Sequence, residues 1–472
     1  MEKMKYDVHI RPPFWQNLAF AIQQVLAIIA GTILVPLLVD PSGTYLTQAS
    51  ALIGAGVGTI VYLALTKFKS PVFLGSSFAF VAPLTMAVSF GYLGILLGTI
   101  FAGLTYVLLA ITIHFSGTNW INKLMPPIII GPVVALIGFD LAGSAIANVM
   151  NTAGGLENYN LISIAIGLVT FFVVVLISVK AKGGIKLFPF VIGIAVGYAI
   201  ACIISLIGIW ADVPYMQIVD FSVYQKIANF ENWLPNLVIV GVIKEGASQI
   251  SSFSNVLTLF VAFVPIALVS FAEHIADHKN LSSIIGKDLT KDPGLTRTLL
   301  GDGIGSMAGA IFGGVPNTTY GESIGCVALS KNASTITILS SAILCILIAF
   351  VYPIIVAISS IPSCVIGGVS IALYGFISVS GLRMFKEIDL NDSRNLFVVA
   401  SIFITGIGGM ILKFGAIEIS NIACALLVGI ITNLLLAPRN KKENGQNDIS
   451  QNRQLLESED TIERKPKRKN KQ

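Results

Sequence analysis

The amino-acid sequence predicts an all-α polytopic membrane protein, and two observations support this fold class. Only 12% of the 472 residues are charged and 54% are hydrophobic, whereas a soluble globular protein carries about 25% charged residues. The mean hydropathy is +0.82, and the chain contains many apolar runs near the length of about 20 residues that crosses a bilayer. The composition therefore excludes a soluble fold class.

Thirteen apolar runs are visible, and each is expected to form a membrane-spanning segment. The polar residues 1–13 that precede the first run are not typical of a cleavable signal peptide. The runs lie at 15–39, 48–66, 72–91, 92–115, 125–147, 160–179, 187–210, 256–277, 296–313, 335–358, 362–382, 395–412 and 416–437.

The stretch 316–322, with the sequence PNTTYGE, is too polar to count as an apolar run. Backbone of this composition is tolerated at membrane depth only where protein or a water-lined cavity satisfies its polar groups. An ionisable residue in such a place is a functional-site candidate. We therefore assign Glu322 to a polar site near the middle of the membrane.

The distribution of lysine and arginine predicts fourteen crossings with both termini in the cytoplasm. Positively charged residues concentrate in the cytoplasmic loops of membrane proteins. When the N-terminus is placed inside and a crossing is added at 314–330, 27 of the 30 Lys and Arg fall on the cytoplasmic side. The outside then holds only Lys226, Lys244 and Lys413. The polar stretch is thus expected to cross the membrane as part of a broken element.

The two halves of the chain resemble each other in three pairs of segments. Each pair is seven spans apart, and an odd number of crossings inverts the second copy relative to the first. Inverted repeats with interrupted segments are typical of secondary transporters that hold substrate at the repeat interface; chance matching of glycine-rich helices is the alternative. The pairs are Gly54–Ile60 with Gly301–Met307, Ser76–Phe78 with Thr318–Tyr320, and Pro126–Val133 with Pro362–Val369.

This repeat divides the chain into five regions. We expect a cytoplasmic N-terminus at 1–14, a first repeat at 15–210, an external or interfacial connection at 211–255, a second repeat at 256–437 and a disordered, solvated tail at 438–472. The basic end of the tail offers an alternative contact with anionic lipid. In each repeat, a half-helix would begin after the small and hydroxyl residues and aim its N-terminal amides at a ligand.

Carboxylates also occur inside the predicted spans. Glu273 and Asp277 are four residues apart, so they share one helix face, and Glu322 supplies a third group. Such carboxylates can exchange protons when they are buried together. Asp302 and Asp140 are further candidates. Their structural alternatives are a hydrogen bond to a neighbouring helix for Asp302 and an interfacial or capping role for Asp140. For Glu273 and Glu322, the alternative is a purely structural role.

His274 and His278 allow a different class of function. They are also four residues apart, which is zinc-ligand spacing, and Asp277 lies beside them, so a membrane metalloenzyme is an alternative. No HExxH motif accompanies them, and His278 is expected to be partly solvated near the cytoplasmic end of its span. The five cysteines form no CxxC and are interpreted as packing residues.

Several of these motifs resemble one transporter family. EHIADHKNL at 273–281, KDPGLTRTLLGDG at 291–303, PNTTYGESIG at 316–325, QQVLAIIAGTILVP at 23–36 and LGSSFAFVAP at 74–83 are similar to the uracil permease branch of the nucleobase–ascorbate transporter (nucleobase:cation symporter-2) family. The resemblance covers residues 15 to about 437.

The resemblance implies a fold and an activity. The fold has fourteen spans in two inverted sevens, a core of spans 1–4 and 8–11, a gate of spans 5–7 and 12–14, and short antiparallel strands in spans 3 and 10. The activity is import of uracil with protons across the cytoplasmic membrane by a homodimer. The resemblance implies no enzyme activity, no cofactor, no resident metal and no nucleic-acid partner.

The resemblance also implies site residues. Glu273 and Glu322 would bind uracil together with backbone groups of Phe78 and Gly321, and Phe78 and Tyr320 would supply apolar surfaces. The family often has histidine where this chain has Asp277, so the proton-coupling residue is open between Asp277, His278 and Glu322. Ser323 and Ser330 replace the usual asparagine and threonine. Glu322 stands where the purine branch usually carries glutamine, which favours uracil over xanthine or urate, and a purine or sodium-coupled carrier is the alternative.

Overall fold

A computed structural model describes residues 4–117, 126–150, 159–229, 233–235, 237–245, 250, 252–414 and 417–437. The predicted tail at 438–472 lies outside these residues. The five cysteines are unpaired, and all except Cys202 are buried, in line with their interpretation as packing residues.

In the described residues of the first half of the chain, the regular elements are helices and one short strand. Its elements are α1 (Phe14–Val39), α2 (Gln48–Leu65), β1 (Leu74–Ser76), η1 (Phe78–Phe80), α3 (Val81–Val88), α4 (Gly91–Ser116), α6 (Pro127–Asp140), α7 (Ala142–Met150), α8 (Leu161–Lys180), η2 (Gly183–Leu187) and α9 (Pro189–Trp210). The predicted connection that follows contains η3 (Pro214–Met216), η4 (Phe221–Ala228) and α10 (Val238–Glu245).

The second half has a similar succession of elements. They are α11 (Phe253–Ile285), η6 (Thr290–Gly294), α12 (Leu295–Phe312), β2 (Asn317–Thr319), α13 (Gly321–Ser330), α14 (Thr335–Ala349), α15 (Tyr352–Ser359), α16 (Ser363–Arg383), η7 (Met384–Glu387), α17 (Ser393–Ile407), β3 (Leu412–Phe414), β4 (Ile417–Ile419) and α18 (Asn421–Leu435). The hairpin of β3 and β4 was not predicted from the sequence.

Eight helices in the described part of the chain are long and apolar enough to cross a membrane, and α14 and α15 form a further pair bent by 79°. The chain is therefore a multi-pass membrane protein. The predicted segments at 72–91 and 314–330 are each a strand followed by a short helix. The run at 72–91 begins as β1 and continues as η1 and α3, while the polar stretch forms β2 and continues as α13.

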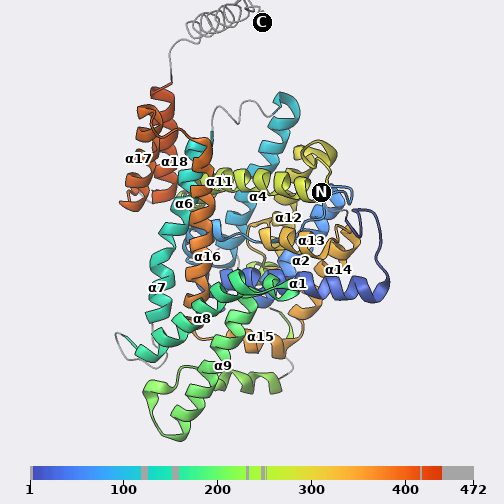
Figure 1. The fold of residues 1–472 in the computed structure, drawn as a ribbon. Coiled ribbons are helices and arrows are strands. Elements are labelled where there is room, and N and C mark those ends of the chain that lie inside the picture. Colours follow the sequence, from blue (N-terminus) through green and yellow to red (C-terminus); the bar gives the residue numbers. More distant parts are fainter. Residues whose placement is uncertain are drawn as a thin grey trace, which may run out of the picture.

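The helices pack in two groups, which Figure 1 shows on opposite sides of the molecule. In one group α12 packs against α2 and α4, α14 packs against α1 and α2, and α11 packs against α4. In the other group α16 packs against α6, α7 and α8, and α17 packs against α18. The strand pair and the two short helices that follow it belong to the first group.

Glycine permits the close contact of α2 with α12. A Cβ atom on Gly58 would lie 2.4 Å from Nδ2 of Asn317 and 3.0 Å from the carbonyl oxygen of Gly305. A Cβ atom on Gly54 would lie 2.2 Å from the Cα atom of Gly314. The glycine-rich runs that the sequence analysis paired as repeats are therefore in direct contact, because neither carries a side chain at the crossing.

Candidate functional site

The site is built around a two-stranded antiparallel sheet inside the membrane-embedded part of the protein. β1 pairs with β2 in the register Leu74–Thr319, Gly75–Thr318 and Ser76–Asn317. Two further bonds extend the pairing, from Ser77 N to the Pro316 carbonyl at 3.0 Å and from Tyr320 N to the Phe73 carbonyl at 3.3 Å. The antiparallel strands expected in segments 3 and 10 are confirmed.

Hydroxyl groups from neighbouring helices satisfy the outer edges of this sheet. Thr59 Oγ1 on α2 accepts a hydrogen bond from Leu74 N at 3.0 Å and lies 3.2 Å from the Leu74 carbonyl. Ser306 Oγ on α12 accepts from Asn317 N at 2.9 Å and lies 3.3 Å from the Asn317 carbonyl. Both hydroxyl residues directly follow the glycines at the helix crossing. Edge groups of a sheet in a membrane need such partners because no water is present to bind them.

A short helix begins just after each strand. η1 and α3 follow β1 from Phe78 onward, and α13 follows β2 from Gly321 onward. No side chain caps the start of either η1 or α13. The first amides of these helices are therefore left to bind another partner, and Glu322 stands in the first turn of α13.

Three carboxylates gather beside these helix starts. Glu273 lies close enough to Asp277 and Glu322 for their charges to interact. Thr319 Oγ1 on β2 donates a hydrogen bond of 2.7 Å to Asp277 Oδ2, which ties α11 to the strand pair. The structure thus brings together Glu273, Asp277 and Glu322, the three acids that the sequence analysis selected.

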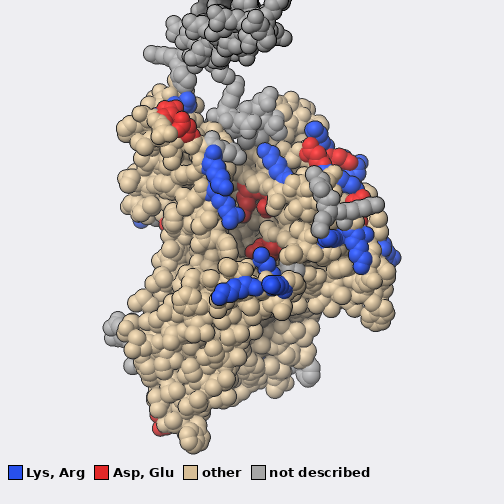
Figure 2. Space-filling view, viewed as in Figure 1, with Lys and Arg blue, Asp and Glu red and all other residues tan. Residues whose placement is uncertain are grey.

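The carboxylates reach an accessible space. Glu273 is exposed, although Phe271 and His274 beside it are buried and α11 is a 33-residue apolar helix. No atom lies within 4 Å of the position that a Cβ on Gly321 would take, and Gly321 is exposed. Figure 2 shows acidic side chains set back in a hollow between the two groups of helices, with lysine and arginine side chains around it.

An aromatic pair connects the two helix groups at this place. Phe78 is half-buried, and its ring lies edge-on to that of Tyr374 on α16, with the centroids 6.4 Å apart. Gly375 follows Tyr374 and faces open space. The sequence analysis did not select Tyr374. Its position in an apolar span gave no signal, because the contact depends on how α16 packs beside η1.

Ser323 fixes the first turn of α13. Its Oγ accepts hydrogen bonds from Gln24 Nε2 on α1 and from Phe73 N, the latter at 3.1 Å. Both Ser323 and Gln24 are buried. Glu322, the preceding residue, is therefore held in place relative to both α1 and β1.

The contacts of the Tyr320 side chain are with other residues of the protein. Its ring lies against Gly31 and Gly75, and its hydroxyl donates to the Ser76 carbonyl at 2.8 Å. Only 4% of the residue is exposed. A direct contact between Tyr320 and a ligand stays a prediction.

The two histidines of α11 differ from expectation. His278 was expected to be partly solvated, but it is fully buried, with Nε2 2.7 Å from the Tyr62 hydroxyl and Nδ1 2.8 Å from the His274 carbonyl. It is buried because Tyr62 of α2 covers it. His274 lies 2.9 Å from Asp302 and 3.0 Å from Thr298. This contact confirms the predicted hydrogen bond from Asp302 to a neighbouring helix.

The structure also places the residues of the remaining sequence-based alternatives. Asp140 is exposed and accepts a hydrogen bond from Asn421 Nδ2, which agrees with an interfacial position. Within the described ranges, no group of three or more His, Cys, Asp or Glu side chains is placed to hold a metal ion. Both ring nitrogens of His274 and of His278 already have protein partners.

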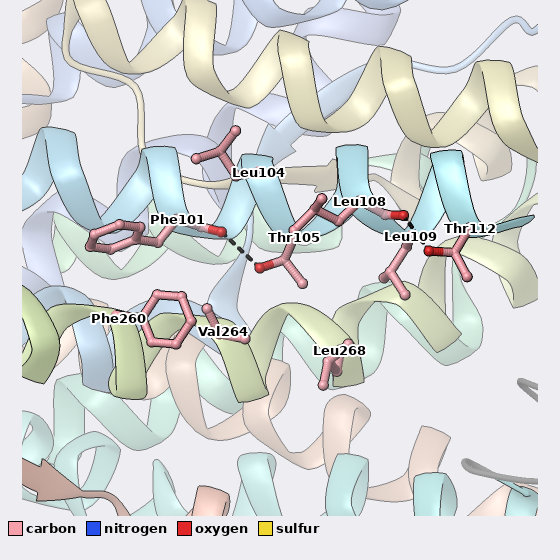
Figure 3. Close-up of a pocket in the computed structure, with 9 residues that line it drawn as sticks. All are labelled: Phe101, Leu104, Thr105, Leu108, Leu109, Thr112, Phe260, Val264 and Leu268. Atoms are coloured by element: carbon pink, nitrogen blue, oxygen red, sulfur yellow. Dashed lines mark hydrogen bonds between the residues drawn. The ribbon is translucent and has the colours of Figure 1, made fainter.

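A separate groove of about 360 Å³ lies between α4 and α11 (Figure 3). Its walls carry apolar side chains, and its two threonine hydroxyls bond to carbonyls of their own helix at 2.8 Å. With about 3.6 residues per turn, its α11 residues Phe260, Val264 and Leu268 lie opposite to Glu273. This groove is distinct from the carboxylate site. Its lining residues are Phe101, Leu104, Thr105, Leu108, Leu109, Thr112, Phe260, Val264 and Leu268.

Known proteins are similar in sequence to this chain over most of its length. A family model described as "Permease family" matches residues 15–414. The uracil permease of Bacillus caldolyticus is 36% identical over 95% of this chain and 99% of the relative. The uracil permease of Escherichia coli strain K12 is 34% identical over 92% of this chain and 94% of the relative. These relatives confirm the resemblance seen in the motifs.

Solved structures share the fold. The transmembrane domain of the cyanobacterial bicarbonate transporter BicA aligns with a TM-score of 0.56 at 13% identity, covering 89% of this chain and 96% of that chain. Murine Slc26a9, an anion transporter in the inward-facing state, aligns with a TM-score of 0.59 at 11% identity, covering 90% of this chain and 69% of that chain. The family match over residues 15–414 and the relatives at 34% and 36% identity show that the chain belongs to this permease family.

Proposed function

We propose that this permease is a secondary active transporter that imports uracil across the cytoplasmic membrane by proton symport. The observation that carries the proposal is the gathering of Glu273, Asp277 and Glu322 at the starts of two short helices, beside an accessible space inside a bundle of apolar helices. The relatives named uracil permeases support the choice of substrate.

The chemistry of the site matches a pyrimidinedione. Uracil has two N–H donors and two carbonyl acceptors. The carboxylates of Glu273 and Glu322 accept from N–H groups, and the amides of Phe78 and Gly321 donate to carbonyls. Phe78 offers the ring an apolar face. Tyr320 acts in this scheme by holding β1, because its hydroxyl is bonded to Ser76.

Proton coupling follows when one group takes part in both proton and substrate binding. Asp277 and Glu322 are half-buried beside the accessible space, and Asp277 is bonded to Thr319. Both nitrogens of His278 are bonded inside the protein. We therefore place proton exchange on Asp277 and Glu322 ahead of His278.

Transport itself is proposed to be an elevator-like motion of a core against a gate. The core comprises α1–α4 and α11–α15, and the gate comprises α6–α9 and α16–α18. The two packing groups described above support this division. We further propose fourteen crossings as two inverted repeats, cytoplasmic termini and a homodimer. A purine carrier and a sodium-coupled carrier remain the second candidates on sequence grounds.

Uptake by proteoliposomes tests the proposal. We expect labelled uracil to enter faster when an inward proton gradient is imposed, with xanthine and urate competing poorly and sodium having no effect. Glu273→Gln should abolish this uptake, whereas Asp212→Asn, an exposed acid in the external connection, should not change it. An uptake rate that does not change with the proton gradient would contradict proton symport. A failure of unlabelled uracil to compete would contradict uracil as the substrate.

A further inference from the structure

The N-terminal segment Met4–Ile10 folds onto the membrane-embedded helices, although the sequence suggested only a polar cytoplasmic end. Lys5 N donates to the Lys331 carbonyl at 2.8 Å, and Ala333 N donates to the Tyr6 carbonyl at 2.8 Å. Thr335 N donates to the Val8 carbonyl at 3.1 Å. The segment therefore runs along the turn that joins α13 to α14.

Side chains fasten the same segment at two further points. The Tyr6 hydroxyl donates to Gln16 on α1, and its ring lies 6.1 Å from that of Phe20. Asp7 forms an ion pair of 2.7 Å with Lys287, which lies between α11 and α12. Three separate parts of the proposed core are thus joined by seven residues.

Val8 belongs to a small hydrophobic cluster built from the elements that carry the site. Only 1% of Val8 is exposed. Ile324 in this cluster is two residues after Glu322, and Leu281 is one turn after Asp277, so the cluster joins the elements that carry the carboxylates. The other buried members are Tyr62, Val72, Leu74, Ile285, Leu289, Val327 and Ala333.

We propose that Met4–Ile10, the N-terminal strap, is a positioning element for the substrate site. By filling the cluster and pairing with the α13–α14 turn, the strap holds α13 against α11 and β1 and so fixes the spacing of Glu322 from Glu273. Val8, Tyr6 and Asp7 are positioning residues that touch no substrate. This inference rests on the proposed function, because the spacing matters only if both glutamates bind one ligand.

The strap acts as a constant part of the fold. The hydrogen bond from Lys287 lowers the pKa of Asp7 below its ordinary value of 3.8, so the ion pair is present across the neutral range. Its backbone bonds and the burial of Val8 do not depend on charge. The strap therefore remains attached through the pH changes that accompany proton transport.

Two adjacent residues give a matched test. Val8 is buried, whereas His9 is exposed. Val8→Asp puts a charge into the cluster, and His9→Asp adds the same charge outside it. We expect Val8→Asp to raise the KM for uracil uptake about tenfold, with Vmax per folded molecule nearly unchanged, and His9→Asp to leave both values as in the wild type.

Milder variants keep the test decisive if Val8→Asp fails to fold. Val8→Ala removes only two methyl groups and should raise the KM about threefold. Val8→Ile keeps an apolar side chain in the cluster and should leave the KM at the wild-type value. A KM equal to that of the wild type in folded Val8→Ala and Val8→Asp protein would overturn the positioning role, even if their melting temperatures fall. If the wild type takes up no uracil, the proposed function fails instead.

Discussion

Helix α2 and the pair α8 and α9 show two different ways of building a membrane-spanning helix. In α2, 72% of the most apolar stretch is buried, compared with 28% in α8 and in α9. The two outer helices are nevertheless the more hydrophobic, and they expose large side chains such as Phe172, Ile203 and Leu206. Of these three helices, the most buried one is thus also the one with the largest share of glycine and other small residues.

This difference follows from the solvent. Lipid tails are as apolar as leucine, so hydrophobicity does not drive one helix against another inside a membrane, and close packing and hydrogen bonds do so instead. In α2, Gly58 permits contact with α12, and Thr59 satisfies the edge of β1. The outer helices need only a surface that lipid can cover. A substitution should therefore destabilise the protein far more in the buried region than on the exposed faces of the outer helices.

The largest effect is expected from filling the glycine contact. In Gly58→Val, the new Cβ would meet Asn317 at 2.4 Å and the Gly305 carbonyl at 3.0 Å, which forces backbone apart. We expect a loss of about 3 kcal/mol in the free energy of unfolding, at the upper end for overpacking. Ile203→Val on the exposed side of α9 should change it by less than about 0.5 kcal/mol. Thermal unfolding of both variants in one detergent checks this prediction. Equal melting temperatures would contradict the expected difference between the buried and the exposed helices.

A smaller loss is expected from removing a polar partner in the buried region. Thr59→Val leaves the Leu74 N–H without its hydrogen bond, and an unpaired buried donor costs about 1–3 kcal/mol. Thr112→Val removes a hydroxyl on α4 that bonds only to its own helix, at Leu108, and should be nearly neutral. The measurement is again thermal unfolding. A neutral Thr59→Val would show that the sheet edge needs no partner from α2.

The next effect concerns ligand binding more than stability. Ser323→Ala removes the acceptor for Gln24 and for Phe73 N, so the turn that carries Glu322 loosens. We expect uracil affinity to fall about tenfold, which corresponds to about 1.4 kcal/mol. The control is Ser341→Ala on α14, which loses only a bond to its own helix at Thr337. Calorimetric titration with uracil measures both, and equal affinities would exclude this role of Ser323.

The smallest effect is expected at the exposed ion pair. Asp7→Asn breaks the contact with Lys287 and should cost about 0.5 kcal/mol, since exposed pairs contribute little. A lowered pKa in the folded protein means that the stabilisation is complete at neutral pH and is lost as the pH falls through the folded-state value. The difference in unfolding free energy between wild type and variant should therefore begin to shrink as the pH falls below about 4 and vanish once the pH is below the folded-state pKa. A difference that grows in acid would contradict this sign.

Much of the candidate site could be predicted because its polar residues stand out against an apolar background. The stretch 316–322 and the pair Glu273 and Asp277 lie in spans where polarity is costly, and the structure places them together. The glycine runs of α2 and α12 were also visible, although their direct contact across the two halves was not foreseen.

Other features could not be predicted, because nothing in the local sequence distinguishes them. The strap depends on the packing of Val8 in a cluster that is built from α11, α13 and β1, which are far apart in the chain. Burial of His278 depends on Tyr62 of α2. Tyr374 matters only through its approach to Phe78. In each case the partner lies on another helix, which patterns within one segment do not reveal.

The central claim is that Glu322, carried by the short helix α13 that follows β2, binds the nucleobase. Its most direct test is calorimetric titration of the purified permease with uracil, comparing the wild type with Glu322→Gln and with Asp212→Asn. The account predicts saturable binding at one site per chain for the wild type and for Asp212→Asn, and no measurable binding for Glu322→Gln. Unchanged affinity in folded Glu322→Gln protein would contradict it.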